Sequence, residues 1–266
     1  MNNYDENIAR FRGTAMLYGL KGLNILKNSS LSIVGIGGVG SWALEALVRT
    51  GIGNIRIFDH DTVSITNTNR QCHALSSSLG QSKAAIFSRR LKDINPDLNI
   101  EYYEEFISPD NISKYFPSEK AREWYVIDAI DSIDSKVALI NHLKRTKYRF
   151  ISSGGAGGKI TASEICIADL SKSQSDPLLA KVKLKLNNEY GFGNSKNSKM
   201  GIKCAFINTP RTNPKQVNSP EELQELSDYF DNGTISFGAC MHVTAALGLK
   251  IAEAMIERII QDGNAT

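Results

Sequence analysis

A glycine-rich run between two short apolar segments constrains the fold more than any other feature of this chain. Residues 31–35 form an apolar segment that enters the run Gly35-Ile36-Gly37-Gly38-Val39-Gly40, and a helix-like segment, 41–50, follows. A second apolar segment, 54–59, ends on the carboxylate of Asp59. The order strand, glycine turn, helix, strand and acidic residue is typical of a nucleotide-binding βαβ unit. The sequence therefore predicts a nucleotide at the carboxyl edge of a parallel sheet.

Each part of this unit has its own physical role. Gly35 permits a tight turn, and Gly37 and Gly38 let backbone N–H groups approach a phosphate. Gly40 lets the helix pack close to the strand, and the helix N-terminus adds the positive end of its dipole. Asp59 is placed to accept hydrogen bonds from ribose hydroxyls. The alternative is a glycine-rich turn that binds no ligand.

The segment after Asp59 carries more polar groups than a nicotinamide dehydrogenase needs. Residues 61–71 place a carboxylate, hydroxyls, amides and one guanidinium at the edge of the sheet. Arg70 offers a planar fork of donors suited to phosphate oxygens. Lys83, at the start of the next helical segment, can neutralise phosphates without a P-loop. The alternatives are an Arg70 paired with Asp61 at the surface and a solvated Lys83.

Taken together, these residues resemble the ThiF/MoeB family of adenylating enzymes, which is related to ubiquitin-activating enzymes. The resemblance runs from about Arg10 to the last helical segment. It rests on Gly-x-Gly-Gly-x-Gly, Asp59-x-Asp61, Asn67-x-Asn69-Arg70-Gln71, Lys83 and Asp128-Ala129-Ile130-Asp131-Ser132. Within the family, the runs at 10–15, 66–71, 126–132 and 154–158 are similar to the dehydratases that act on threonylcarbamoyladenosine in tRNA.

The resemblance implies a set of site residues. Arg70, Lys83 and Asp131 would be catalytic, with Asp131 holding magnesium near the reacting phosphate. Asp128 would be a second neighbour of the metal or a carboxylate that caps the loop. The relatives commonly use an N-terminal arginine that reaches across a dimer, and Gly13 occupies the aligned place here, with Arg10 and Arg12 close by. The ATP-binding set would comprise Gly35, Gly37, Gly38, Gly40, Asp59, Asp61, Asn67, Asn69, Arg70, Gln71, Lys83, Asp128, Asp131 and Ser132.

The reaction that the resemblance implies is an ATP-dependent dehydration of threonylcarbamoyladenosine beside the tRNA anticodon. ATP would activate the carboxylate of the modification, and ring closure would follow. A homodimer and sulfur-trafficking partners of the cysteine desulfurase system are the expected associates. The main alternative is an adenylating activator of a ubiquitin-like or sulfur-carrier protein. A dehydrogenase that uses the glycine turn alone, or a non-catalytic nucleotide-binding adaptor, would leave Arg70, Lys83 and Asp131 without a role.

The cysteines weaken the protein-activating alternative. The chain has four of them, far apart and without a CxxC pair, so we expect no zinc site. The acceptor cysteine of thioester transfer has no obvious counterpart, because the run 233–238 stands in its expected place. Cys204 and Cys240 lie in apolar sequence, which favours buried structural cysteines.

Composition indicates an ordinary globular protein of a reducing compartment. The chain has 266 residues, of which 41% are hydrophobic and 22% are charged. Scattered cysteines and the polar start of the chain, without a signal peptide, predict a cytoplasmic protein. The apolar segment 237–260 contains several charged residues, so we expect a packed helix there and no membrane span.

The periodicity predicts a doubly wound, mainly parallel α/β sheet within a single domain, 1–266. N-terminal helices would present Leu17, Leu20, Leu23 and Leu26 on one face. The nucleotide-binding half, 31–153, would contain strands at 31–35, 54–59, 99–105, 124–128 and 149–153. The substrate and dimer half, 154–266, would add a strand at 164–168, a helix at 177–189, a strand at 202–207 and the C-terminal helix. The stretches 191–199 and 209–232 would be mobile loops.

Lysines gather in the second half although the net charge is only +3. With Tyr190 and Phe192 between them, they could follow an RNA backbone and stack a base. The alternative is a solvated helix face joined to a lysine-rich loop. The residues proposed to bind tRNA are Lys181, Lys183, Lys185, Lys196 and Lys199.

Overall fold

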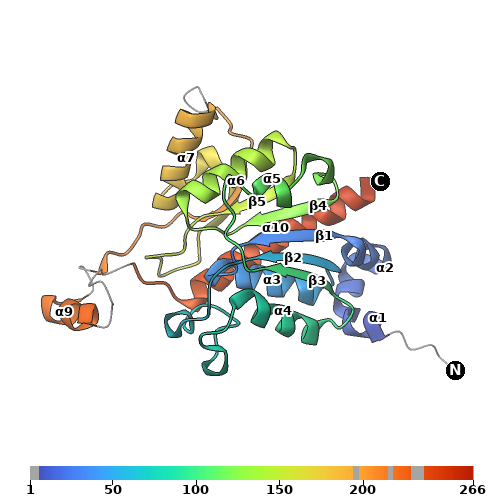
Figure 1. Cartoon of the computed structure of the whole chain (residues 1–266), viewed down its shortest axis with the longest axis horizontal. Helices are drawn as coiled ribbons and strands as arrows, with labels where there is room; N and C mark the ends of the chain where they lie inside the picture. The colour runs from blue at the N-terminus through green and yellow to red at the C-terminus, as the bar shows by residue number, and fades with distance from the viewer. Residues whose placement is uncertain (1–5, 194–197, 215–217, 229–236, 266) are drawn as a thin grey trace.

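Seven strands form one continuous sheet in the computed structural model, which describes residues 6–193, 198–214, 218–228 and 237–265 (Figure 1). The strand order is β3-β2-β1-β4-β5-β7-β6, and every neighbouring pair is parallel except β6 with β7. Pairing of β5 with β7 joins the two halves of the chain in this sheet. The strands are β1 (Ser30–Val34), β2 (Asn54–Phe58), β3 (Asn99–Tyr103), β4 (Trp124–Asp128), β5 (Arg149–Ser153), β6 (Ile165–Asp169) and β7 (Lys203–Ile207).

Helices cover both faces of the sheet (Figure 1). The largest apolar core lies between the sheet and α2, α3, α4 and α10, and two further cores lie under α5, α6 and α7. The helices are α1 (Glu6–Arg10), α2 (Arg12–Asn28), α3 (Gly38–Thr50), α4 (Lys83–Ile94), α5 (Ile112–Tyr115), α6 (Ile133–Arg145), α7 (Pro177–Tyr190), α9 (Pro220–Asp228) and α10 (Met241–Ala265). Short 3₁₀ turns lie at Ile65–Asn67, Ser76–Ser78, Ser118–Lys120 and Leu170–Lys172.

The predicted fold class is confirmed. The sheet is mainly parallel, and the strands expected from the apolar runs lie within two residues of their predicted bounds. Central strands of a parallel sheet are buried on both faces, so they read as short continuous apolar runs. Strands β2 and β3 lie on one side of β1, and the chain then crosses to β4 on the other side. This reversal of strand order creates a switch point, where ligands of doubly wound sheets bind.

The predicted leucine face of the N-terminal helices is wrong in part. Leu23 and Leu26 are buried, but Leu17 is 81% exposed and Leu20 is 64% exposed. Gly19 interrupts α2 with non-helical dihedral angles (φ 73°, ψ 169°), so Leu17 and Leu20, which flank this kink, do not continue the face of Leu23 and Leu26. A spacing rule for a straight helix does not apply across such a kink.

The predicted loop 209–232 contains a helix within the residues that the structure describes. Helix α9 begins after Ser219, which accepts the N–H of Glu222, while the Glu222 carboxylate accepts the N–H of Ser219 (2.6 Å). This capping box, with Pro220 in the first turn, is a helix-start signal within a segment that its prolines and polar residues otherwise make resemble a loop. In Figure 1, α9 stands apart from the sheet. Residues 194–197, 215–217 and 229–232 of the two predicted loops lie outside the described residues.

The segment 237–260 behaves as a packed helix. Helix α10 buries one side against α3 and the sheet, with Val243, Leu247, Ile251 and Ile259 fully buried. Among the helices that the structure describes, none is long and apolar enough to cross a membrane.

Candidate active site

A cavity of about 1,030 Å³ opens at the carboxyl edge of the parallel strands. It collects loops that follow β1, β2, β4 and β5, together with the start of α10. The predicted site residues that line it are Gly35, Gly37, Gly38, Asp59, Asp61, Asn67, Asn69, Arg70, Gln71, Lys83 and Asp131. The fold thus brings most of the predicted ATP-binding residues to one hollow.

The glycine turn has the geometry that its sequence suggests. Gly35 has φ of +86°, a conformation that favours glycine, and its N–H donates to the carbonyl of Phe58 (2.8 Å). A Cβ added at Gly40 would overlap the carbonyl oxygen of Gly35, so a larger residue would push α3 away from the turn. Gly37 is the N-cap of α3 and, with Gly38, lines the cavity. The helix therefore presents its unpaired first N–H groups to the hollow, an arrangement suited to an anion.

Asp59 fastens the glycine turn from the end of β2. Its carboxylate accepts the N–H of Ile36 (2.8 Å) and that of Asp61 (3.0 Å). Burial raises the pKa of Asp59, while the two backbone donors and the nearby Lys83 oppose that rise. Each carboxylate oxygen keeps a second lone pair, so Asp59 can bind a ribose hydroxyl and still hold the turn.

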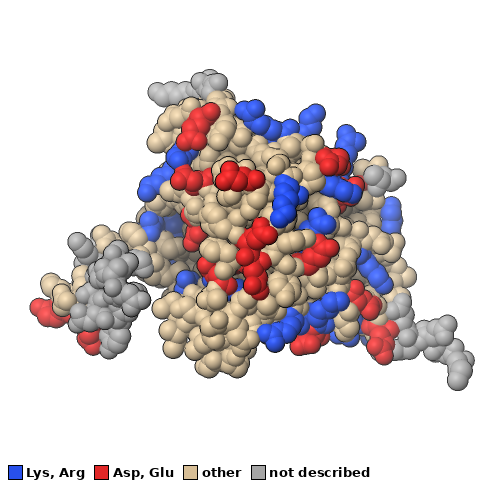
Figure 2. Space-filling model, viewed as in Figure 1, with Lys and Arg blue, Asp and Glu red and all other residues tan. Residues whose placement is uncertain are grey.

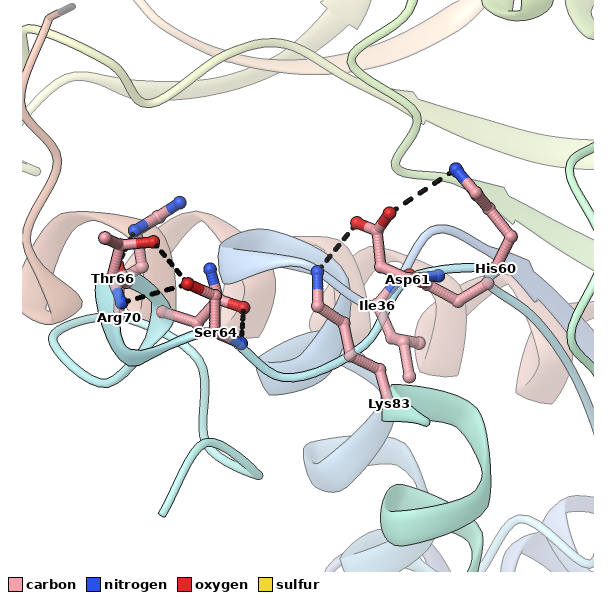
Figure 3. A network of polar contacts seen from close by, with 9 residues as sticks. Ile36, His60, Asp61, Ser64, Thr66, Arg70 and Lys83 are labelled. Carbon is pink, nitrogen blue, oxygen red and sulfur yellow. Dashed lines mark hydrogen bonds and ion pairs between the residues drawn. The ribbon is translucent and has the colours of Figure 1, made fainter. Parts of the chain in front are cut away.

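Lys83 reaches the cavity from the first turn of α4 (Figure 3). Its Nζ lies 2.8 Å from the carboxylate of Asp61, and its side chain is only 6% exposed. The other oxygen of Asp61 lies 3.4 Å from Nε2 of His60. Lys83 is therefore a buried cation that faces the nucleotide side, and the solvated-helix alternative does not describe it. Asp61 pairs with Lys83 and not with Arg70.

The loop after β2 holds Arg70 at the cavity wall. The guanidinium donates to the carbonyl of Thr66 (2.6 Å) and to the side-chain oxygen of Asn69 (3.2 Å). The side-chain oxygen of Asn67 accepts the N–H of Ser64, and the side-chain amide of Asn69 donates to the carbonyl of Ala239 (2.7 Å). The two asparagines thus shape the loop, while Arg70 keeps further donors for a ligand.

Asp131 and Asp128 follow the same strand but have different surroundings. Asp131 is exposed at the cavity, and within the described residues no group donates to its carboxylate. Asp128 is fully buried, accepts the N–H of Ile130 (3.2 Å) and the hydroxyl of Ser152 (2.7 Å), and lies 3.0 Å from Nζ of Lys136. This arrangement favours the loop-capping alternative for Asp128 over contact with ATP or a metal. Ser132 is the N-cap residue of α6 and is also not part of the cavity wall.

Comparison with known proteins identifies the family. The family model for ThiF matches residues 11–255, which is most of the chain. The chain belongs to the ThiF family.

Individual ThiF-family relatives cover nearly the whole chain. The tRNA threonylcarbamoyladenosine dehydratase of Escherichia coli is 39% identical over 254 residues, which are 94% of this chain and 93% of that protein. The crystal structure of the E. coli dehydratase, TcdA, in complex with AMP covers 100% of both chains, with a TM-score of 0.87 and 37% identity. The structure of the same enzyme in complex with ATP also covers 100% of both chains, with a TM-score of 0.85 and 36% identity.

The lysines of this ThiF-family chain do not form one uniform face. Lys181 and Lys199 are exposed, whereas Lys183 is half-buried and donates to the carbonyl of Ser173 (2.7 Å). Lys185 pairs with Asp134 and lies 3.6 Å from the carboxylate of Glu189. Basic and acidic side chains are interspersed over this part of the surface (Figure 2). Lys196 lies outside the described residues.

The predicted stacking aromatics are engaged elsewhere. Tyr190 and Phe192 are partly buried against the apolar core under α7. Because a base needs an open ring face, this packing does not support the predicted stacking role. Two other aromatic residues, Phe106 and Phe237, line the cavity and are 44% and 41% exposed. They were missed because no local motif surrounds either residue.

The cysteines differ from one another. Cys204 is fully buried, and burial raises the pKa of its thiol. Cys240 is exposed directly after Ala239, which lines the cavity, so the prediction of a buried Cys240 is wrong. The residue precedes α10 and its carbonyl accepts the N–H groups of Val243 and Thr244, which holds it at the helix start. Its apolar neighbours in sequence do not bury it, because Ala239 lines the cavity and Met241 is 48% exposed.

A second hollow of about 750 Å³ lies near the chain start and is lined by four arginines, Arg10, Arg49, Arg89 and Arg90. Arg49 and Arg90 both bind the carboxylate of Glu45, and Arg10 donates to the carbonyl of Ile94 (3.1 Å). These contacts join the N-terminus to α3 and α4, which gives the arginines a structural role.

Proposed function

We propose that this chain is an ATP-dependent tRNA threonylcarbamoyladenosine dehydratase. One observation carries the proposal: a single cavity joins the glycine turn to Arg70, Lys83 and the exposed carboxylate of Asp131. The near-complete match to the E. coli dehydratase supports the choice of substrate.

The first step requires two anions, a carboxylate and a phosphate, to approach each other. Arg70 and Lys83 supply positive charge at the place where phosphate would lie, and the N-terminus of α3 adds backbone donors. The side chain of Lys83 is held by Asp61, so little reorganisation is needed when the ligand binds. These residues would lower the barrier to attack by the carboxylate oxygen on a phosphorus atom of ATP.

Magnesium fits the donor set near Asp131. Its carboxylate is exposed at the cavity without a donor from the described residues, and hard cations prefer such oxygen ligands. A bound magnesium ion would offset phosphate charge during activation. The ion pair between Asp128 and Lys136 would hold the loop that presents Asp131, because Lys136 also donates to the carbonyl of Ile130 (3.0 Å).

Ring closure needs no protein nucleophile. The carbamoyl group of the same modification attacks the activated carbonyl, the phosphate-bearing group leaves, and the net change is the loss of one water. Because the two groups belong to one molecule, proximity supplies much of the rate. The role of the protein is then to hold the modification and to exclude bulk water from the activated carbonyl.

The test is to incubate the purified protein with ATP, magnesium and tRNA that carries threonylcarbamoyladenosine, and to weigh the nucleosides under mild conditions. We expect an ATP-dependent loss of one water, about 18 mass units, that disappears in Arg70→Ala and Asp131→Ala. Asp110→Ala, at an exposed carboxylate outside the cavity wall, is the matched control and should retain the activity. An unchanged nucleoside with ATP still consumed would contradict the proposal.

A second candidate is the activation of a ubiquitin-like or sulfur-carrier protein. The exposed thiol of Cys240 beside the cavity is the observation that favours it, because thioester transfer needs an accessible cysteine. This candidate predicts that Cys240→Ser abolishes turnover. The dehydratase predicts that the same variant stays active, since ring closure uses no cysteine.

The remaining expectations belong to the same proposal. A homodimer would cover the exposed apolar side chains of α2, where Met16 is 78% exposed and Leu17 is 81% exposed. Sedimentation of wild type and Leu17→Glu would measure the oligomeric state. We expect a dimer for the wild type and a monomer for the variant. Lys181, Lys185 and Lys199 would contact the tRNA. The scattered cysteines favour a cytoplasmic location, and the resemblance implies sulfur-trafficking partners.

A further inference from the structure

The cavity has a second end on the side of β5, two strands away from the glycine turn. We call it the acceptor end, defined by residues 153–157, Leu178, Phe237 and Gly238. A nucleotide on the glycine turn would occupy the opposite end, which leaves this one to the second substrate. The acceptor end is therefore the place to look for groups that recognise the RNA.

Arg211 contacts two residues that line the acceptor end, Gly157 and Phe237. Its Nε donates to the carbonyl of Gly157 (3.0 Å), and its guanidinium carbon lies 3.3 Å from the centre of the Phe237 ring. Its Nη2 lies 3.8 Å from the position that a Cβ on Gly157 would take. Arg211 does not itself line the cavity, but Gly157 and Phe237 do, so its remaining donors on Nη1 and Nη2 lie next to the acceptor end.

The backbone around Arg211 is tied in place. The N–H of Thr212 donates to the carbonyl of Gly158 (2.7 Å), and the N–H of Gly158 donates to the carbonyl of Gly238 (2.7 Å). A Cβ at Gly158 would lie 2.9 Å from the Phe237 ring, so glycine leaves room for the stacked pair. Lys159 is buried and donates to the carbonyls of Ser175 and Thr209, which anchors the segment before Arg211. The guanidinium is thus held in position before a substrate binds.

The charge of Arg211 has no ion-pair partner among the residues that the structure describes. Within the part of the chain that the structure describes, no carboxylate lies at ion-pair distance from it. The carboxylates at the other end are engaged, since Asp61 binds Lys83 and Asp59 accepts two backbone N–H groups. A half-buried guanidinium without a counter-ion, beside a cavity, is suited to an oxyanion that arrives with a ligand.

We propose that Arg211, stacked on Phe237, recognises the carboxylate of the modified adenosine at the acceptor end. The inference rests on the proposed dehydratase function. The planar fork of Arg211 would bind one carboxylate oxygen and orient the other toward the nucleotide. It would also offset the repulsion between that carboxylate and the phosphates of ATP. Arg211 is thus a residue that sets specificity for the modified base over plain adenosine.

The test compares Arg211→Gln with wild type on two probes, the tRNA that carries threonylcarbamoyladenosine and the same tRNA with unmodified adenosine. A charged hydrogen bond of this kind corresponds to about a 10- to 100-fold change in affinity. We expect Arg211→Gln to lose that factor on the modified tRNA, with an unchanged Kd for the unmodified tRNA and for ATP. Arg211→Lys keeps the charge without the fork and should recover only part of the loss. A melting curve of each variant checks that it is folded.

The other outcomes separate the two proposals. Equal losses on both tRNAs would mean that Arg211 contacts a backbone phosphate, and no loss would mean that it contacts no substrate; either result overturns this inference. Turnover of the modified tRNA by wild type would leave the dehydratase intact in both cases. Absence of wild-type turnover would overturn the dehydratase and this inference together.

Discussion

The two ends of the cavity are built in opposite ways. The nucleotide end comes mainly from one stretch of chain, 35–83, in which Asp59 holds the glycine turn and Asp61 holds Lys83. The acceptor end joins segments that lie far apart in sequence, as when Arg211 meets Gly157 and Phe237. A local motif can therefore reveal the first end, whereas only folding creates the second. The predictions below test this difference, from the largest expected effect to the smallest.

The largest effect is expected at the ion pair beneath the loop of Asp131. Lys136→Met leaves the fully buried carboxylate of Asp128 without its cation, which costs about 3–5 kcal/mol of stability. Urea unfolding measures the loss. Lys144→Met, at an exposed lysine of the same helix, is the control and should change stability by less than about 1 kcal/mol. Equal stabilities for the two variants would show that the pair does not support the loop.

Lowering the pH should reduce the stability of the protein through His73, a buried histidine. Burial, together with the charges of Lys83 and Arg90, lowers the pKa of His73 to about 4, and neither ring nitrogen has a hydrogen-bond partner among the described residues. The unfolded chain binds the proton near pH 6.5, so stability falls as the pH drops from about 6.5 to 4, by about 3 kcal/mol at pH 4.

His73→Leu isolates this contribution. Urea unfolding of wild type and variant at pH 7.5 and pH 4 should show a smaller acid loss in the variant. The comparison is needed because Asp59 titrates in the opposite sense, since its raised pKa makes protonation favour the folded state. An identical acid loss in both proteins would exclude His73 as the cause.

The acceptor end should depend on Lys159 without affecting the nucleotide end. Lys159→Met leaves the carbonyls of Ser175 and Thr209 without their donor, which costs about 1–3 kcal/mol. Because Thr209 leads to Arg211, we also expect a higher KM for tRNA and an unchanged Kd for ATP. A change in both constants would mean that the two ends are coupled.

Glycine substitutions should separate folding from binding at the nucleotide end. Gly37→Ala meets only the Gln71 amide at 4.0 Å, so the protein should fold normally, but the methyl would face an arriving phosphate and weaken ATP binding by about tenfold. Gly40→Ala should instead lower stability, because the added carbon overlaps the Gly35 carbonyl. Calorimetry with ATP and melting curves measure both. Unaltered ATP affinity in Gly37→Ala would argue against a phosphate at this turn.

The smallest effects are expected on the lysines of α7. Lys181→Ala should weaken tRNA binding a few-fold. It should also lower the salt slope, the slope of the logarithm of affinity against the logarithm of salt concentration, by about one. Lys183→Ala should leave the salt slope unchanged, because the ammonium of Lys183 donates to the carbonyl of Ser173. Binding measured from 50 to 200 mM salt distinguishes them. Equal slopes for both variants would contradict the assignment.

Sequence patterns predicted the sheet well and the surface of the second half poorly. Apolar runs fixed β1, β2, β4 and β5 because a strand buried on both faces leaves a local signature. The capping box at Ser219 lies among prolines and polar residues, whose pattern predicts a loop and hides the helix start. The exposure of Cys240 and Leu17 could not be read from neighbouring residues, because burial depends on which elements pack against them.

The sequence by itself determined the βαβ unit, the glycine turn and the presence of Asp59, Arg70 and Lys83 at one sheet edge. These features follow from backbone geometry and from the periodicity of adjacent residues. The tertiary structure alone decided that Asp128 is buried against Lys136 while Asp131 faces the cavity. It also decided that Arg211 lies on Phe237. Charges find their partners through space, so the role of a titratable residue becomes visible only when distant segments have been brought together.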